Sequence, residues 1–356
     1  MAKGIGVIGS GNWGTTLAHL IGQAGHPVMI WSRNPETVQE MNHQKTNHTY
    51  TPGLKISDSV SATTVLRDIA THCELIFIVV PSKSFREVAN QLGACVGGDQ
   101  ILVSGTKGIE NKTFRTMSEI LKEETCCKKV GALSGPNIAT EIIQGDPSGC
   151  VIASSYQEVI DKVIEVIQQP QFKIYGNKDI KGVEIGGALK NIIAIACGMA
   201  TGLNSGNNAK AFLMTRGLVE MARYGKFLGA NPETFYGLSG IGDLIATCYS
   251  QHSRNQTFGR ELAKGKTMDE ILQNIHMVVE GVYTVQAAHT VAQKFNIFMP
   301  ITEGIYKILF EHARVPDVIK ELMAVRIKFE DERQKDDFSN IKHMLVDKYP
   351  IPEYLL

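Results

Sequence analysis

The stretch VIGSGNWGTTLA (residues 7–18) joins a short apolar run to a helix-like segment through the pattern G-x-G-x-x-G, formed by Gly9, Gly11 and Gly14. Between a strand and a helix, the first glycine allows a tight turn, the second lets the backbone approach a pyrophosphate, and the third lets helix and strand pack closely. The free N–H groups of the helix N-terminus favour the phosphates. The loop therefore predicts dinucleotide binding. Its candidate cofactor-binding residues are Gly9, Gly11, Asn12, Trp13 and Gly14.

Short apolar runs alternate with helix-like segments through the first half of the chain. The run LIFIVV (75–80) is unbroken, as expected of a central parallel strand that is buried on both faces. Strands that alternate with helices indicate a mostly parallel, doubly wound sheet. We therefore expect an α/β, Rossmann-like dinucleotide-binding domain over residues 1–185. The other expected strands are 5–9, 28–31, 101–104, 130–134, 150–154 and 172–175.

From about residue 180, helix-length segments separated by glycine-rich joints dominate the pattern. We expect an all-helical substrate-binding and catalytic domain over residues 186–335. The end of the chain, KYPIPEYLL (348–356), carries two prolines, and we expect a loose C-terminal tail over 336–356. The expected helices lie near 180–200, 208–227, 242–249, 255–264, 282–294 and 302–312.

The composition argues against several functional classes. The chain has 356 residues, with 36 basic and 36 acidic side chains, so its charge does not favour nucleic acid or an anionic membrane. The most apolar run, 192–203, is shorter than the roughly 20 residues of a membrane span. No signal-like segment opens the chain, and its seven cysteines lack a C-x-x-C motif, so we expect reduced thiols in a cytoplasmic protein. The ten histidines are scattered, and we expect no metal site.

The acidic residue that usually binds the adenine ribose is missing. It should end the second strand, about 20 residues after the glycine loop, but VMIWSRNPE (28–36) has Ser32 and Arg33 there. The absence of an acid removes repulsion against a 2′-phosphate, and Arg33 can attract one. This favours NADP(H), or the use of both NADP(H) and NAD(H). Alternatively, Arg33 is a solvated loop residue that stacks on the adenine.

A second unusual stretch is GGALKNIIAIACGMATGL (186–203), which is apolar on nearly every side yet contains Lys190 and Asn191. A helix that is apolar all round is usually buried, and a buried ammonium is costly unless it is paired or faces a cavity. Lys190 therefore either faces a functional cleft or extends its head to water. Asn191 either binds a ligand or is a polar group satisfied within the core.

Six motifs occur in a fixed order along the chain: SGTKGIE (104–110), LSGPNIATEI (133–142), ALKNIIAIACG (188–198), GLSGIGDLIATC (237–248), SRN (253–255) and VEGVYT (279–284). Together they closely resemble NAD(P)-dependent glycerol-3-phosphate dehydrogenase, over roughly residues 4–330. The chain departs from the family in two places. The family usually has Ser or Thr where this chain has Asn137, and often Gly-Ala-Gly where it has Gly9-Ser10-Gly11.

The resemblance implies the reduction of dihydroxyacetone phosphate to sn-glycerol 3-phosphate by a nicotinamide hydride. As the hydride arrives, the ketone oxygen needs a proton and a positive neighbour, and a lysine ammonium supplies both. The resemblance likewise makes Lys190 the general acid and base. It also implies that the product serves glycerophospholipid synthesis and that the enzyme is a homodimer.

Asp243 follows the flexible run Gly240-Ile241-Gly242 and opens a helix-like segment. A carboxylate there can pair with Lys190 and keep it charged, or accept a hydrogen bond from a substrate hydroxyl. It can also be a plain first-turn acid of the helix. Thr247 lies one turn later on the same face, where it either adds a hydroxyl contact or is an ordinary helix threonine.

The run Ser253-Arg254-Asn255 is typical of a phosphate clamp, because arginine offers a planar fork to a phosphoryl group. The alternative is a surface arginine at a helix start. Lys107 follows an expected strand, at the edge of a parallel sheet where ligands bind. The resemblance gives Lys107 contacts to cofactor and substrate. It places Gly135 and Asn137 near the substrate, and Ala139, Arg254, Val278 and Glu280 near the cofactor.

Two other functions remain open from the sequence. One is a sibling two-domain dehydrogenase, acting on a 3-hydroxy acid, 6-phosphogluconate or ketopantoate. The other is an NAD(P)-binding sensor without turnover. Lys107 and Arg254-Asn255 argue against the sibling enzymes, and the presence of Lys190 argues against the sensor.

Overall fold

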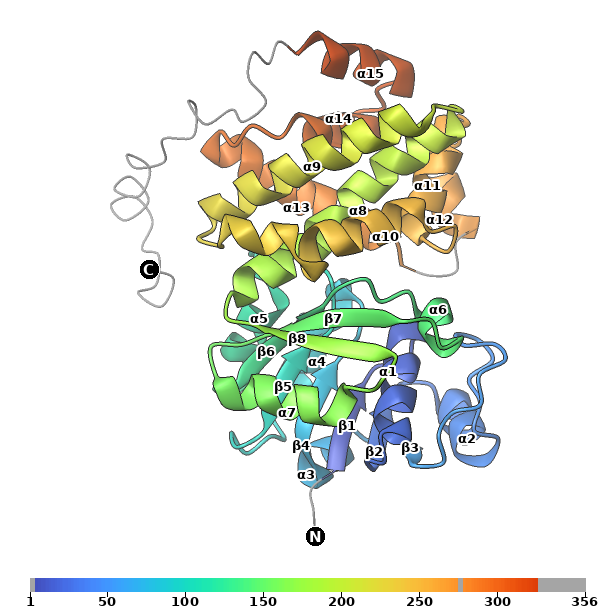
Figure 1. Cartoon of the computed structure of the whole chain (residues 1–356), viewed down its shortest axis with the longest axis vertical. Coiled ribbons are helices and arrows are strands. Elements are labelled where there is room, and N and C mark those ends of the chain that lie inside the picture. Colours follow the sequence, from blue (N-terminus) through green and yellow to red (C-terminus); the bar gives the residue numbers. More distant parts are fainter. Residues whose placement is uncertain (1–3, 275–277, 326–356) are drawn as a thin grey trace.

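The computed structural model describes residues 4–274 and 278–325. Figure 1 shows two bodies, a sheet domain formed by the first half of the chain and a helical domain formed by the second. The expected tail over 336–356, and residues 326–335 of the expected helical domain, lie outside the described residues.

The sheet domain contains an eight-stranded sheet in the order β3-β2-β1-β4-β5-β6-β7-β8. Neighbouring strands are parallel except for β6 and β7, which are antiparallel. The prediction of a mostly parallel sheet is therefore confirmed. The sequence reading missed β3, because its residues VSAT form no apolar run. The strands are β1 (Gly4–Ile8), β2 (Val28–Trp31), β3 (Val60–Thr63), β4 (Cys73–Ile78), β5 (Ile101–Ser104), β6 (Val130–Ser134), β7 (Ser148–Ala153) and β8 (Phe172–Asn177).

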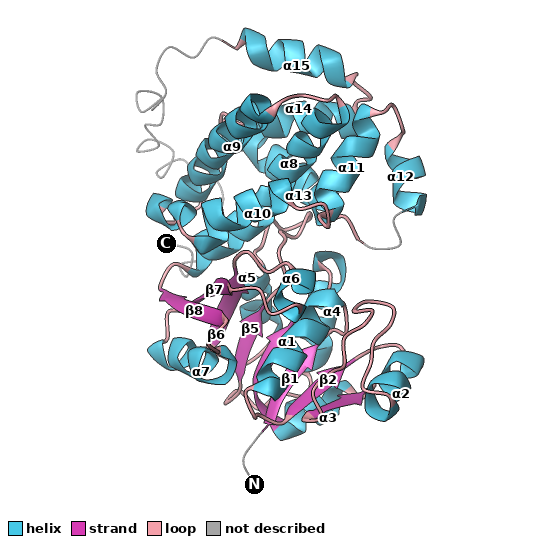
Figure 2. Ribbon diagram, turned by 45° about the vertical axis from the view of Figure 1, so that its right-hand side comes forward, coloured by secondary structure: helices cyan, strands magenta, loops and turns pink. Residues whose placement is uncertain are grey.

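Helices cover both faces of the sheet, as Figure 2 shows. One face packs against α1 and α7 in a single apolar core, and the other packs against α3, α4 and α5. This is the doubly wound arrangement predicted from the alternating pattern. The helices of this domain are α1 (Asn12–Gln23), α2 (Pro35–His43), α3 (Leu66–His72), α4 (Ser82–Gly93), α5 (Met117–Glu124), α6 (Ala139–Ile143) and α7 (Gln157–Ile167).

The helical domain is built around α8 (Ile180–Gly202), which is buried along nearly its whole length. By length and composition α8 could cross a membrane, yet its apolar window is wholly buried inside the molecule. The expected domain boundary, between residues 185 and 186, falls within this helix. The sequence reading missed the short helix α12 and also α15. The other helices are α9 (Asn207–Phe227), α10 (Asp243–Tyr249), α11 (Arg254–Ala263), α12 (Met268–Asn274), α13 (Glu280–Phe295), α14 (Pro300–Phe310) and α15 (Val315–Ala324).

Candidate active site

The three glycines of the first loop have three different surroundings. Gly9 has φ of +116°, and a Cβ there would lie 2.7 Å from the carbonyl oxygen of Val79. A Cβ on Gly14 would lie 1.9 Å from the carbonyl oxygen of Gly9. At Gly11, by contrast, a Cβ would meet nothing within 4 Å. The geometry thus matches a tight turn, close packing of helix on strand, and an open approach to the backbone.

Several buried polar atoms of the predicted binding residues have no hydrogen-bond partner in the described protein. Asn12 Oδ1 and Trp13 Nε1, both at the start of α1, have no hydrogen bond to the described protein, and neither amide atom of Asn137 has one. Buried polar groups are nearly always hydrogen-bonded in folded proteins. These side chains therefore fit a site that a polar ligand completes, and the helix N-terminus suits the phosphates of a dinucleotide.

The end of β2 is tied to the glycine loop. Ser10 Oγ donates a hydrogen bond of 2.7 Å to Ser32 Oγ, and Ser32 is buried. The side chain of Arg33 follows it and is exposed, with no hydrogen bond or ion pair to any residue that the structure describes. This placement agrees with an arginine that reads a 2′-phosphate and equally with one that stacks on adenine.

Asp243 joins two lysines that come from different domains. Lys190 Nζ on α8 donates to Asp243 Oδ1, and it donates to Thr247 Oγ1 at 2.6 Å. Lys107 Nζ, which follows β5, lies 2.5 Å from Asp243 Oδ2 and donates to the Gly135 carbonyl at 2.8 Å. The predicted pairing of Asp243 with Lys190 is confirmed. The alternative in which Lys190 extends its head to water is wrong, because Lys190 is only 6% exposed.

Burial and neighbouring charges together shift the pKa of the Lys190 ammonium. Burial lowers the pKa of Lys190, the Asp243 carboxylate raises it and the positive charge of Lys107 lowers it, so that the resulting pKa is about 8. A lysine with this pKa can both give and take a proton near neutral pH.

A π-helical turn, Leu238–Gly242, leads directly into Asp243. A Cβ on Gly240 would lie 2.0 Å from the Phe235 carbonyl oxygen, and a Cβ on Gly186 of α8 would lie 2.6 Å from the Ser239 carbonyl oxygen. Only glycine allows these two approaches, so the turn packs closely against α8. Such turns are often found at functional sites, and this one brings Asp243 to Lys190.

The run Ser253-Arg254-Asn255 begins α11. Ser253 is the N-cap and accepts a hydrogen bond from the Gln256 amide at 3.3 Å. Arg254 has an exposed side chain that donates through Nη1 to the Val278 carbonyl at 2.9 Å. The guanidinium therefore joins α11 to the segment that precedes α13, and it keeps further N–H donors.

Asn255 and Asn191 are paired inside the helical domain. Asn255 Nδ2 donates to Asn191 Oδ1 at 2.9 Å, and Asn255 Oδ1 accepts from the Gly281 amide at 3.0 Å. Both side chains are buried. Asn255 therefore connects α8, α11 and the start of α13, a role that the sequence reading did not include.

Glu280 lies at the start of α13 and reaches into the sheet domain. Its carboxylate accepts a hydrogen bond from the Ser82 amide at 3.1 Å and one from the Ser82 hydroxyl at 2.5 Å. Burial raises the pKa of Glu280, while the Ser82 hydrogen bonds and the charge of Arg254 lower it. Glu280 thus caps α4 across the domain junction.

The remaining predicted residues lie at the carboxyl end of β6. Gly135 follows β6 with φ of +137°, a conformation that favours glycine, and its carbonyl holds Lys107. Ala139 is buried at the start of α6.

Among the described residues, no group of three or more His, Cys, Asp or Glu side chains could hold a metal ion.

Residues 4–160 match the family model for the N-terminus of NAD-dependent glycerol-3-phosphate dehydrogenase, and residues 179–320 match the model for its C-terminus. The chain belongs to the NAD-dependent glycerol-3-phosphate dehydrogenase family.

Relatives in this family match over nearly their whole length. The chain is 42% identical over 323 residues to glycerol-3-phosphate dehydrogenase [NAD(P)+] from Staphylococcus haemolyticus, covering 90% of this chain and 97% of the relative. It is 44% identical over 322 residues to the enzyme of that name from Macrococcus caseolyticus, with the same coverage. The crystal structure of glycerol-3-phosphate dehydrogenase from Coxiella burnetii superimposes with a TM-score of 0.87 at 35% identity, covering 91% of this chain and 99% of that chain.

In this member of the glycerol-3-phosphate dehydrogenase family, the sequence-based prediction missed two further contacts. One is Ser82, which binds Glu280 and follows the unbroken strand β4; a polar residue after a central parallel strand was an available signal. The other is Asn47, wholly buried, which donates to the Ser10 carbonyl at 2.9 Å and supports the glycine loop. No pattern around Asn47 indicated this contact.

Proposed function

We propose that the chain interconverts dihydroxyacetone phosphate and sn-glycerol 3-phosphate, using NADH or NADPH, with Lys190 as general acid and base. The observation that carries this proposal is the buried Lys190 ammonium, which is held by Asp243 and Thr247 and has a pKa of about 8. The reaction is the one for which the family is named. The names of the relatives given above include both cofactors.

A nicotinamide, when bound, would supply the hydride in the reductive direction and accept it in the other. As the ketone carbon gains hydrogen, its oxygen becomes negative and takes a proton from Lys190 Nζ. Lys107 contributes a second positive charge to the same site, and this charge stabilises the developing alkoxide. In the oxidative direction, neutral Lys190 removes the proton of the secondary hydroxyl. Asp243 orients both lysines in each direction.

We assign the substrate phosphate to Arg254, with support from Ser253 and Asn255. Arg254 uses one N–H for the Val278 carbonyl and retains others for a phosphoryl group. Asn255 uses its oxygen and one N–H within the protein, so at most one donor remains for the substrate. We assign Gly135 and Asn137 to the same substrate, and Ala139, Val278 and Glu280 to the cofactor.

We propose that residues 1–185 bind the cofactor, that residues 186–335 complete the catalytic site, and that two copies associate through the helical domain. Large apolar side chains are exposed there, including Tyr236 at 69%, Ile245 at 44% and Tyr249 at 52%. We also place the enzyme in the cytoplasm, where it would supply sn-glycerol 3-phosphate for glycerophospholipid synthesis. All seven cysteines are free thiols, which agrees with a reducing compartment.

The test is a steady-state assay that follows the ultraviolet absorbance of NADH or NADPH. Dihydroxyacetone phosphate should be reduced with either cofactor, while ketopantoate and unphosphorylated dihydroxyacetone should react at least about a hundredfold more slowly in kcat/KM. A preference for ketopantoate would contradict the proposal, and so would a folded protein that binds cofactor but turns over none of these ketones.

A further inference from the structure

Glu184 is a buried acid outside the site described above, and it joins the two domains. It lies on α8, the helix that carries Lys190, and is 6% exposed. Its Oε1 accepts a hydrogen bond from the Ser118 amide at 2.8 Å, and its Oε2 accepts one from the Ser118 hydroxyl at 2.5 Å. Two hydrogen bonds from the sheet domain therefore end on one side chain of α8.

The partner of Glu184 is the first turn of α5, whose N–H groups have no acceptor within their own helix. Thr116 and Glu119 form a capping box, in which the Glu119 carboxylate accepts from the Thr116 amide at 2.9 Å. The Ser118 amide is left over, and Glu184 accepts its hydrogen bond. The carboxyl group thus completes the cap of α5 from another domain, at the end of the helix that favours negative charge.

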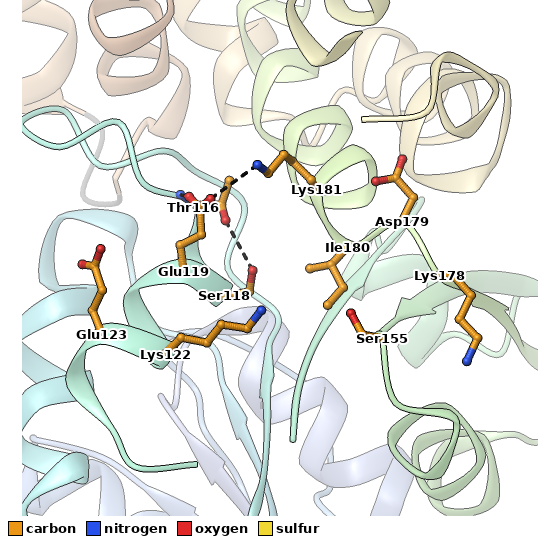
Figure 3. Close-up of a pocket in the computed structure, with 10 residues that line it drawn as sticks. All are labelled: Thr116, Ser118, Glu119, Lys122, Glu123, Ser155, Lys178, Asp179, Ile180 and Lys181. Carbon is orange, nitrogen blue, oxygen red and sulfur yellow. Dashed lines mark hydrogen bonds and ion pairs between the residues drawn. The ribbon is translucent and has the colours of Figure 1, made fainter. Parts of the chain in front are cut away.

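The seam between the starts of α5 and α8 contains a cavity of about 510 Å³. Figure 3 shows Thr116, Ser118 and Glu119 on one side of this cavity and Ile180 and Lys181 on the other. Beside it, a small apolar cluster packs α8 against the sheet; the cluster is formed by Ala132, Val151, Ala153 and Val183 with Ile180. Apolar contacts are not directional, whereas hydrogen bonds require a defined distance and angle. The Glu184 hydrogen bonds therefore fix the register of α8 at this seam.

The next turn of α8 packs against Lys107 on one side and against the turn that precedes Asp243 on the other. A Cβ on Gly187 would lie 2.6 Å from Ser134 Oγ and 3.4 Å from Lys107 Cγ. A Cβ on Gly186 would lie 2.6 Å from the carbonyl oxygen of Ser239, in the turn before Asp243. A shift of α8 at this point would move Lys190 relative to both Lys107 and Asp243.

We propose that Glu184 is a positioning residue of the reaction, which anchors the start of α8 to α5 and so sets where Lys190 stands relative to Lys107 and Asp243. This inference rests on the function proposed for Lys190. A helix rises 1.5 Å per residue, so the anchor lies about 9 Å along α8 from the lysine and acts through the rigid helix. A misplacement of about 1 Å at a reacting group can cost roughly a hundredfold in rate.

The chain contains a matched control for this role. Glu220 on α9 is also a buried acid that caps a helix from outside, because its carboxylate accepts hydrogen bonds from the Ile301 amide, the Thr302 amide and the Thr302 hydroxyl of α14. Neither α9 nor α14 carries a residue assigned to the reaction. Glu184→Ala and Glu220→Ala therefore remove the same kind of cap, one next to the site and one away from it.

The experiment measures kcat, KM, cofactor Kd, Tm and the primary deuterium isotope effect on kcat, using NADH that carries deuterium at the transferred position. Both variants should lower Tm by several degrees, because each leaves buried N–H groups unpaired. Glu184→Ala should lower kcat at least about tenfold and raise the isotope effect, with cofactor Kd changed less than about twofold. Glu220→Ala should leave kcat within about twofold. Glu184→Gln, which keeps the length and an amide acceptor for Ser118, should recover most of kcat.

Several results would overturn the inference. One is a Glu184→Ala protein whose kcat and isotope effect match those of Glu220→Ala. Another is a loss confined to KM or to cofactor Kd. If Glu184→Ala does not fold, Ser118→Ala removes one of the two hydrogen bonds, and an unchanged kcat and isotope effect in that variant would equally reject the role. A wild-type protein that fails to reduce dihydroxyacetone phosphate would instead reject the proposed function, so the two failures are distinguishable.

Discussion

The Lys107 ammonium lies 2.5 Å from Asp243 Oδ2, across the junction of the sheet domain and the helical domain. Since Asp243 also accepts from Lys190, one carboxylate balances two ammonium groups, and the site as a whole carries excess positive charge. That excess suits an oxygen that becomes negative during hydride transfer. The positive charge of Lys107 also lowers the pKa of Lys190, so the pH dependence of the reaction depends on a residue of the other domain.

The first prediction concerns the pH profile. Ketone reduction requires protonated Lys190, so kcat should be highest below a pH of about 8 and fall above it, while alcohol oxidation should rise through the same range. Lys190→Ala should lower kcat by roughly 10² or more without weakening cofactor binding. Lys107→Met removes a neighbouring positive charge and should raise the pKa of Lys190. The decrease in kcat for ketone reduction should then occur at a higher pH than in the wild type. Lys107→Arg keeps the charge and should leave the pH of this decrease unchanged. If the decrease in kcat occurs at the same pH in Lys107→Met as in the wild type, the electrostatic coupling is refuted.

The second prediction concerns cofactor choice. No acid follows β2, and Arg33 is exposed without a partner among the described residues, so NADPH should serve at least as well as NADH. Arg33→Asp should raise KM for NADPH selectively, through repulsion of the 2′-phosphate. Arg33→Ala is the control that removes attraction without adding repulsion. If both cofactors lose equally in each variant, Arg33 stacks on adenine rather than reading the phosphate.

The third prediction concerns the substrate phosphate. Arg254→Ala should cut kcat/KM for dihydroxyacetone phosphate about tenfold to a hundredfold, mostly through KM, because a charged hydrogen bond contributes about 1.5–3 kcal/mol. Arg254→Lys should recover only part, since a point charge cannot form the planar fork. Unphosphorylated dihydroxyacetone should hardly respond to either change. Equal losses for both ketones would mean that Arg254 serves the Val278 segment or the cofactor instead.

The fourth prediction separates two glycines of the nucleotide loop. Gly14→Ala places a Cβ 1.9 Å from the Gly9 carbonyl oxygen, so the loop must deform, and Tm should fall by several degrees. Gly11→Ala has open space around the new methyl group, so Tm should change by less than about two degrees while cofactor Kd rises at least about tenfold. Thermal melts and fluorescence titration with NADH measure the two effects. A Gly11→Ala protein that binds NADH normally would show that the pyrophosphate does not approach there.

The fifth prediction concerns stability against pH. Burial raises the pKa of Glu220 to about 7, above that of an unfolded glutamate near 4.5. The unfolded chain therefore ionises first, and the stability contributed by this group is complete below about pH 4.5 and is lost as pH rises through about 7. Glu220→Gln should flatten the fall in Tm between pH 5 and pH 8 relative to wild type. Parallel Tm curves for the two proteins would contradict the raised pKa.

Several features of this chain were determined by the sequence alone. The glycine loop, the unbroken run that became β4 and the helical second half follow from local patterns, because the period of apolar residues and the backbone freedom of glycine act over a few residues. Lys190 could be recognised in the same way, since an ammonium in an apolar helix requires a partner wherever the helix lies. Its pairing with Asp243 followed from the family motifs and the requirement for an opposite charge.

Only the tertiary structure decided which distant groups meet. The hydrogen bonds of Glu184 to Ser118, of Asn255 to Asn191 and of Glu280 to Ser82 join residues 66, 64 and 198 positions apart. The antiparallel step from β6 to β7, and the short strand β3 at the sheet edge, likewise depend on pairing with partners that no local period reveals. The physical reason is that a buried carboxyl or amide group needs a hydrogen-bond partner, but its own sequence does not say which one. The packing of the two domains determines which partner lies within reach.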